Sequence, residues 1–192
     1  MNATAPWSPR WTTRANALTL LRLLLAPALA AALLHGAAGL ALSLFLLAVA
    51  TDFADGWVAR RYRETTPFGA FADHAVDATF VTAGTAALAH GGALPALLPA
   101  LIALAFAQYA LDSRATAASS LVGSRLGRWN GIAYYVIVAV PVVRDALALA
   151  WPGRALVMAL GWALVASTLV SMVDRLRKLR CAPQASSERP PP

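Results

Sequence analysis

Four aspartates with helical spacing are the residues of this chain best suited to chemistry. Asp52 and Asp55 are three positions apart, and Asp73 and Asp77 are four positions apart, so each pair shares one face of a helix. Both pairs lie inside apolar sequence, where an ionisable side chain costs roughly a few kcal/mol and usually marks a functional site. We interpret the stretch 52–77 as a site built around converging negative charge.

Two helices that follow each other directly could bring the four carboxylates together. Pro67 interrupts the chain between them, and Thr65 or Thr66 could cap the second helix, so antiparallel helices would meet with their acidic faces near one end. Four carboxylates at low dielectric repel one another unless cations neutralise them. The aspartates therefore predict hard divalent cations such as Mg²⁺, which prefer oxygen ligands, and no Cys or compact His cluster in the sequence suggests a softer metal.

Small residues extend both acidic faces. Gly56 and Ala59 continue the stripe of the first aspartate pair, and Gly69 precedes the second pair by one turn. Residues without bulk let a phosphate group approach the backbone and the metals. Arg60, next to the first stripe, offers a charge-assisted donor suited to a diphosphate. Carboxylate-bound metals beside an arginine indicate phosphoryl transfer.

The elements that position these residues read as membrane helices. Of the 192 residues, 59% are hydrophobic, well above the roughly 45–50% of a soluble domain. Apolar runs of about 20 residues, the length needed to cross a bilayer, lie at 15–35, 39–61, 68–91, 93–114, 128–150 and 154–176. The fifth is the weakest, because it contains Pro141 and soon meets Arg144, so we expect it to be short, tilted or dependent on snorkelling of its charged side chains. We predict an all-α integral membrane protein, a bundle of six transmembrane helices.

The basic residues predict the orientation of this bundle. All but Arg144 and Arg154 of the 16 Lys and Arg residues fall on one side of the six spans. The positive-inside rule then places both termini in the cytoplasm and the aspartates at the cytoplasmic face of the cell (cytoplasmic) membrane. The net charge of +7 lies at the ends of apolar segments, so we expect membrane lipids and no nucleic acid as partners.

The chain divides into three parts on composition. Residues 1–14 mix aromatic and basic side chains and are expected to form an interfacial N-terminal segment. Residues 15–178 would form the transmembrane domain, and the polar, Pro-rich residues 179–192 a disordered tail. The first apolar run could also be read as a cleavable secretory signal, but its long polar lead and the equally apolar segments that follow favour a retained first span.

Residues 52–77 match the pattern D-x2-D-G-x2-A-R-x8-G-x3-D-x3-D at every fixed position. The chain thereby resembles the CDP-alcohol phosphotransferases, also called CDP-alcohol phosphatidyltransferases. The first span adds weaker similarity, since the family pattern N-x-L-T-x-x-R-x-x-x-x-P is matched by Asn16, Leu18, Thr19, Arg22 and Pro27.

The resemblance implies transfer of the phosphatidyl group of CDP-diacylglycerol to an alcohol, with release of CMP, in phospholipid synthesis. Two divalent cations, Mg²⁺ or Mn²⁺, would be bound by Asp52, Asp55, Asp73 and Asp77, and Asp77 would also be the general base. The resemblance further implies CDP contacts by Asn16, Thr19, Gly56, Ala59, Arg60, Thr66 and Gly69. Members of the family are typically homodimers, so the same is expected here.

The acceptor alcohol is the least determined part of this hypothesis. Arg114, Arg125 and Arg128 could clamp a phosphorylated acceptor, or could simply set the topology. Leu126-Gly127-Arg128 look like the L-G-K of phosphatidylglycerophosphate synthases, although Trp129 and Asn130 stand where those enzymes usually have Lys-Thr. Glycerol 3-phosphate is therefore our first choice, with inositol phosphate, serine or phosphatidylglycerol as alternatives.

A function of another class is a small cation transporter with the aspartates as its ion path. That function would favour acids near the bilayer midplane and broken helices in both halves of the chain. The sequence instead gathers the acids in one hairpin, which favours the enzyme.

Overall fold

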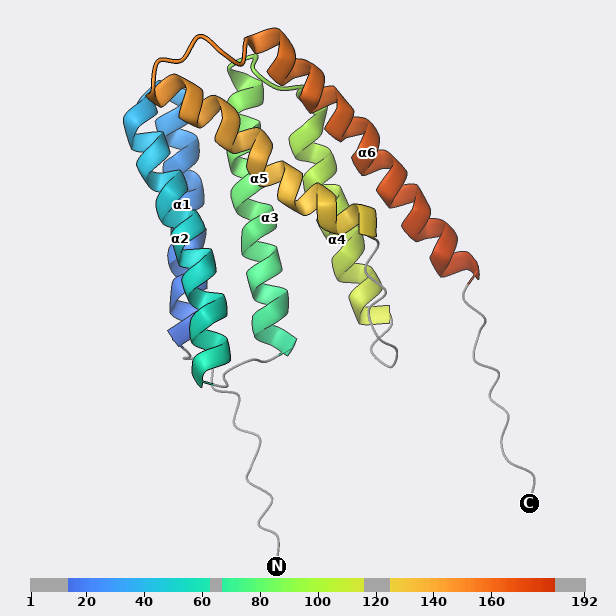
Figure 1. Cartoon of the computed structure of the whole chain (residues 1–192). Helices are drawn as coiled ribbons and strands as arrows, with labels where there is room; N and C mark the ends of the chain where they lie inside the picture. The colour runs from blue at the N-terminus through green and yellow to red at the C-terminus, as the bar shows by residue number, and fades with distance from the viewer. Residues whose placement is uncertain (1–13, 63–66, 116–124, 182–192) are drawn as a thin grey trace, which may run out of the picture.

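The computed structural model describes residues 14–62, 67–115 and 125–181, except for some side chains near the helix ends. The described residues form six α-helices and no strand (Figure 1). The helices are α1 (Arg14–Leu34), α2 (Ala38–Tyr62), α3 (Pro67–His90), α4 (Leu97–Ala115), α5 (Arg125–Ala146) and α6 (Arg154–Cys181). Their order and number agree with the six apolar runs of the sequence. The predicted segments 1–14 and 179–192 lie almost entirely outside the described residues.

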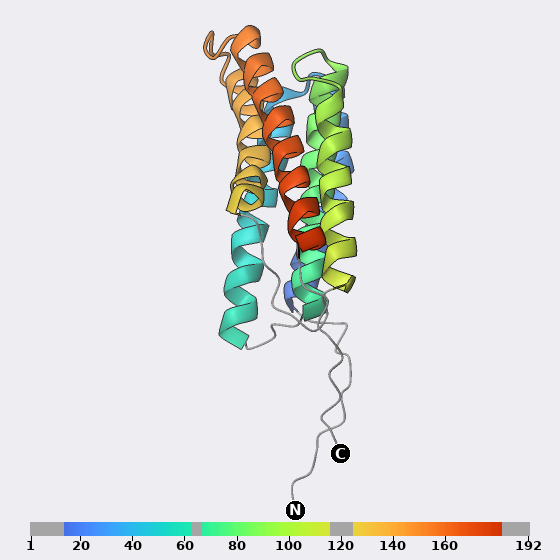
Figure 2. The same ribbon diagram turned by 90° about the vertical axis from the view of Figure 1, so that its right-hand side faces the viewer.

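Successive helices run in alternate directions through one bundle. The short connections at 35–37, 91–96 and 147–153 lie at the upper end in Figure 1. Helix α1 packs against α2 and α3. Helix α4 packs against α3 on one side and contacts α6 as well. Helix α5 lies across the bundle and contacts α2, α3 and α6 (Figures 1 and 2). This arrangement places α3 inside the bundle, with neighbours on several sides.

The core is packed from apolar side chains and close helix contacts. Leu29, Phe80 and Val138 are fully buried between α1, α3 and α5. Gly84 of α3 lets this contact form, because a Cβ atom there would lie 3.1 Å from a methyl group of Val138. Gly161 of α6 similarly lets Pro95, in the connection between α3 and α4, pack directly against its backbone. Close packing around small residues is the usual source of helix association in lipid.

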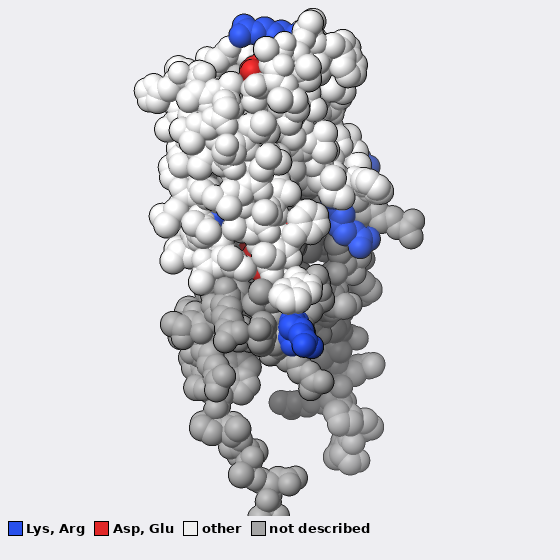
Figure 3. Space-filling view, turned by 60° about the vertical axis from the view of Figure 1, so that its left-hand side comes forward, with Lys and Arg blue, Asp and Glu red and all other residues white. Residues whose placement is uncertain are grey.

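The outer surface fits a membrane environment. Large apolar side chains on several helices point outward, as Leu24, Leu46 and Val170 do. Figure 3 shows a broad uncharged surface on one face of the molecule, with Lys and Arg side chains above it and in the lower half. In the described part of the chain, four helices are long and apolar enough to cross a membrane: α1, α2, α5 and α6. The fold is thus that of an all-helical membrane protein.

Helices α3 and α4 are not among these four. Helix α3 carries two of the aspartates, and the apolar stretch of α4 among the described side chains, Leu97–Leu111, is shorter than a full span. Helix α4 begins four residues later than expected, because Pro95 lies in the connection before it. Helix α5 ends at Ala146, close to Arg144, but it has 22 residues and is long enough to cross a membrane, so the fifth helix is not the short one.

Candidate functional site

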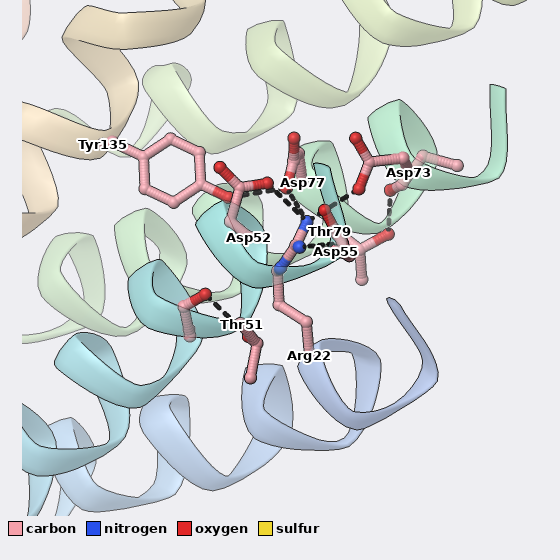
Figure 4. Close-up of polar contacts among 10 residues, drawn as sticks. Arg22, Thr51, Asp52, Asp55, Asp73, Asp77, Thr79 and Tyr135 are labelled. Carbon is pink, nitrogen blue, oxygen red and sulfur yellow. Dashed lines mark hydrogen bonds and ion pairs between the residues drawn. The ribbon is translucent and has the colours of Figure 1, made fainter. Parts of the chain in front are cut away.

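The four aspartates lie together between α2 and α3 (Figure 4). Carboxylate oxygens of Asp52, Asp55 and Asp73 come within 4.8 Å of one another, close enough to bind one metal ion. Asp77 lies one turn beyond Asp73 on α3 and joins them through a shared basic partner. The Asp55 side chain is 8% exposed and the Asp52 side chain 39%, so one side of this aspartate cluster is open.

Arg22 of α1 is that shared partner, and it lies at the centre of the aspartate cluster. Its Nη2 donates to Asp55 Oδ2 at 2.5 Å, and its Nη1 donates to Asp77 Oδ1 at 2.5 Å and to Asp73 Oδ1 at 2.9 Å. Nη1 is also 3.0 Å from Asp52 Oδ1. The Arg22 side chain is 0% exposed. One buried guanidinium therefore ties α1 to both acidic helices, and a buried charge is stable only when it is paired in this way.

The donor set of the aspartate cluster suits a hard divalent cation. Carboxylate oxygens are the ligands that Mg²⁺ and Mn²⁺ prefer. One guanidinium cannot balance four carboxylates, so the described cluster keeps a net negative charge even with Arg22 in place. Asp52, Asp55 and Asp73 could therefore bind a divalent cation.

Tyr135 of α5 also contacts the aspartate cluster. Its hydroxyl donates to Asp77 Oδ1 at 2.8 Å (Figure 4). The Tyr135 ring stacks on Phe80, with 6.0 Å between ring centres and 19° between planes, and Phe45 makes tilted contacts with both rings. Because both rings are fixed in the core, the hydroxyl has a defined position. The Asp77 carboxylate is thus held from α5 and α1 at once.

A pocket of about 950 Å³ opens beside the aspartate cluster. Residues of α3, α4, α5 and α6 line most of it, and Asp52 of α2 completes the wall. Asp52 and Asp77 belong both to this pocket and to the aspartate cluster. A molecule in the pocket would therefore lie against two of the four carboxylates.

Two arginines line the same pocket. Arg128 lies near the start of α5, and Arg175 lies in the lower part of α6. The Arg175 guanidinium is 5.3 Å from the centre of the Tyr109 ring, and that ring stacks on His74 with 5.7 Å between ring centres. An anionic group in this part of the pocket would meet positive charge held on an aromatic surface.

The remaining predicted site residues are only partly described. Thr19 is buried on α1, one turn before Arg22, and Gly69 lies on α3 one turn before Asp73. Among the predicted acceptor contacts, Arg128 lines the pocket. The other predicted contacts have side chains outside the described part of the structure: Asn16, Gly56, Ala59, Arg60, Thr66, Arg114 and Arg125.

Sequence reasoning did not assign three residues of this site. Arg22 had a signal, because it is a charge inside an apolar run that matches a family position, but its partners could not be read from the sequence. Tyr135 and Arg175 had none, since a tyrosine in a membrane span and an arginine near a span end are both common. Their roles depend on how α5 and α6 pack against α3 and α4.

The fold and the site together define a helical membrane protein with an aspartate cluster at the wall of a pocket. The family model for CDP-alcohol phosphatidyltransferase matches residues 12–173, which is most of the chain and includes the whole aspartate cluster. The protein belongs to this family.

Curated relatives agree with the family. The chain is 34% identical over 134 residues to the CDP-diacylglycerol--glycerol-3-phosphate 3-phosphatidyltransferase of Cereibacter sphaeroides. This alignment covers 65% of this chain and 61% of the relative. It is 39% identical over 94 residues to a probable phosphatidylglycerophosphate synthase of Mycobacterium tuberculosis, covering 46% of this chain and 45% of that protein. The chain thus spans about three fifths of the first relative and under half of the second.

Proposed function

We propose that this protein transfers the phosphatidyl group of CDP-diacylglycerol to glycerol 3-phosphate, giving phosphatidylglycerophosphate and CMP. The observation that carries the proposal is that Asp52 and Asp77 belong both to the aspartate cluster and to the pocket wall. A donor at the cluster and an acceptor in the pocket would meet at these carboxylates. The names of the relatives support glycerol 3-phosphate as the acceptor.

The reaction requires that a proton leave the acceptor hydroxyl. The hydroxyl oxygen forms a bond to the phosphatidyl phosphorus while the bond from that phosphorus to the CMP oxygen breaks. We assign Asp77 as the general base that takes the proton. Arg22 and Tyr135 both donate to Asp77 Oδ1, so they would hold the carboxylate while its Oδ2 receives the proton.

The same cluster is our proposed metal centre. Asp52, Asp55, Asp73 and Asp77 would bind two divalent cations, with Mg²⁺ preferred and Mn²⁺ as the alternative. When bound, the cations would supply the positive charge that neutralises the diphosphate of the donor. Arg22 would keep the four carboxylates at a fixed spacing from α1.

Donor recognition is assigned to the surface around the cluster on α1, α2 and α3. Thr19 and Gly69 each lie one turn from a residue of the cluster, which supports a role in holding the CDP moiety. The glycines would let the diphosphate approach the backbone, and Arg60 would bind it as a donor. The complete proposed set is Asn16, Thr19, Gly56, Ala59, Arg60, Thr66 and Gly69.

The acceptor would bind in the pocket with its phosphate toward the arginines. Arg128 and Arg175 line the pocket and are our first candidates for this contact, with Arg114 and Arg125 as further members of the clamp. Glycerol 3-phosphate carries the phosphate that such a clamp needs and a hydroxyl to transfer to. Serine lacks a phosphate, so the pocket favours it less.

We further propose that all six helices cross the cell (cytoplasmic) membrane, with residues 15–178 as the transmembrane domain and both termini in the cytoplasm. Arg128, Arg175 and Lys178 lie at one end of the bundle, whereas Arg144 and Arg154 lie at the other, which supports this orientation under the positive-inside rule. The pocket would then receive a soluble acceptor from the cytoplasm. A homodimer is proposed by analogy with the family.

Reconstitution tests the reaction. Purified protein in phosphatidylcholine vesicles is given CDP-diacylglycerol, Mg²⁺ and one acceptor from a panel of glycerol 3-phosphate, inositol phosphate, serine and phosphatidylglycerol. Released CMP is measured by chromatography and the new lipid by mass spectrometry. We expect phosphatidylglycerophosphate with glycerol 3-phosphate. If no acceptor releases CMP, while the vesicles take up divalent cations, the transporter hypothesis replaces ours.

A further inference from the structure

Two amide side chains of the pocket each have one atom without a hydrogen-bond partner among the described residues. These atoms are Nδ2 of Asn130 on α5 and Oε1 of Gln108 on α4, and both residues line the pocket. Asn130 is only 4% exposed. A buried polar group left unpaired costs roughly 1–3 kcal/mol, so such groups usually meet a ligand or water.

The other amide atom of each side chain is already held. The Ser167 hydroxyl donates to Asn130 Oδ1 at 2.6 Å, and Gln108 Nε2 donates to the Met172 carbonyl at 3.2 Å. Asn130 therefore keeps an unpaired N–H donor in the pocket wall, and Gln108 keeps an unpaired carbonyl acceptor there. One donor and one acceptor together complement a hydroxyl group, which both accepts and donates a hydrogen bond.

Along the helix axes, both amides lie at levels between the arginines and the part of the pocket wall that holds Asp77. On α5, Asn130 comes two residues after Arg128 and five residues before Tyr135, which is about 7.5 Å of helix rise. Gln108 bonds to the backbone of α6 at Met172, one turn from Arg175 on the side away from the lower end. An acceptor with its phosphate at the arginines and its reacting hydroxyl at Asp77 would place its middle carbon beside these amides.

We propose that Asn130 and Gln108 recognise a second hydroxyl group of the acceptor, next to the hydroxyl that reacts. This inference rests on the proposed function and adds the residues that select its substrate class, a phosphorylated polyol with neighbouring hydroxyls. Glycerol 3-phosphate has such a hydroxyl at its middle carbon. An ammonium group at the same place can donate to Gln108 but cannot accept from Asn130, so serine is excluded by the same pair.

The test compares glycerol 3-phosphate with 3-hydroxypropyl phosphate, which lacks only the middle hydroxyl. For the wild-type protein, we expect kcat/KM to be roughly ten- to a hundredfold higher with glycerol 3-phosphate, the effect of leaving buried polar groups unpaired. The variants Asn130→Leu and Gln108→Met keep the approximate side-chain volume and remove the hydrogen-bonding atoms. In each variant the ratio of kcat/KM for glycerol 3-phosphate to kcat/KM for 3-hydroxypropyl phosphate should fall to about three or less. The drop should come from slower turnover of glycerol 3-phosphate, while turnover of 3-hydroxypropyl phosphate changes little.

Ser43→Ala is the control, because Ser43 is exposed on α2 and bonds to its own helix at Gly39, so the ratio should stay at the wild-type value. A wild-type ratio near one would overturn the inference before any variant is made. Equal loss with both substrates in the variants would assign the amides a structural role and would also overturn it. If the wild-type protein releases no CMP with either substrate, the proposed function itself falls, and this inference falls with it.

Discussion

Replacing Arg22 by methionine should destabilise the protein, and divalent cations should restore much of the loss. Methionine keeps most of the length of the side chain but removes the positive charge. Four carboxylates that share the Arg22 guanidinium would then have no basic partner at the centre of the described cluster. Repulsion among them would push α2 and α3 apart and weaken their contact with α1.

The size of this effect follows from burial. Removing one partner of a buried ion pair costs about 3–5 kcal/mol. Three of the four carboxylates are 27–39% exposed, so solvent screens part of the repulsion and the lower end of that range, about 3 kcal/mol, applies. A chain of this length loses roughly 2–4 °C in Tm per kcal/mol, so we expect Tm to fall by about 6–12 °C.

Thermal unfolding in detergent, followed by circular dichroism, measures the loss in EDTA and again in MgCl₂. Mg²⁺ should raise the Tm of Arg22→Met more than that of the wild-type protein, because the cation would replace the missing charge. The Tm of Arg22→Lys should lie between the values for Arg22→Met and the wild-type protein, since lysine keeps the charge but lacks the planar guanidinium that bonds several carboxylates. A variant that melts within about 2 °C of wild type in EDTA would refute this account of the cluster.

Three further substitutions test other parts of the site and fold. Tyr135→Phe removes the hydroxyl that donates to Asp77, so kcat should fall roughly tenfold with both KM values nearly unchanged, as steady-state kinetics would measure. Gly161→Ala would place a Cβ atom 2.5 Å from Pro95 Cδ, so overpacking should cost about 1–3 kcal/mol in thermal unfolding. Arg175→Gln should raise the KM for glycerol 3-phosphate tenfold or more and leave the KM for CDP-diacylglycerol unchanged.

Matched controls decide whether these effects are specific. In Gly39→Ala the new Cβ atom would have no atom within 4 Å, so this substitution should not destabilise the protein. Equal stability of Gly39→Ala and Gly161→Ala would contradict the packing argument. Arg177→Gln removes a neighbouring exposed charge of α6 that does not line the pocket. An equal rise in KM for both arginine variants would reduce the Arg175 effect to general electrostatics. For Tyr135→Phe, an unchanged kcat would show that Asp77 needs no support from α5.

The positions of the helices and of the aspartates could be predicted from the sequence for local reasons. Long apolar runs bounded by Pro, Gly and basic residues define the helices. The spacing of Asp52 with Asp55 and of Asp73 with Asp77 fixes which carboxylates share a helix face. Because α2 and α3 are neighbours in sequence, an antiparallel hairpin was enough to bring the two faces together.

Contacts between distant helices could not be predicted in the same way. Arg22 and Asp77 are 55 positions apart, and Tyr135 and Asp77 are 58 apart, so their pairing depends on how α1 and α5 pack on α3. The role of the amide pair Asn130 and Gln108 is still harder to predict from the sequence. Asn130 drew notice only as a departure from a family pattern, and its role depends on which of its two amide atoms Ser167 already occupies.

The most direct test of the account is CMP release by the reconstituted protein as a function of Mg²⁺, with Asp77→Asn as the comparison. Asparagine keeps the shape of the side chain and can still accept from Arg22 and Tyr135, but it cannot serve as a base at neutral pH. We predict CMP release that requires both Mg²⁺ and glycerol 3-phosphate, and a loss of at least about a hundredfold in Asp77→Asn at unchanged Tm. CMP release that persists in EDTA, or in Asp77→Asn, would contradict the central claim that this aspartate cluster performs the transfer.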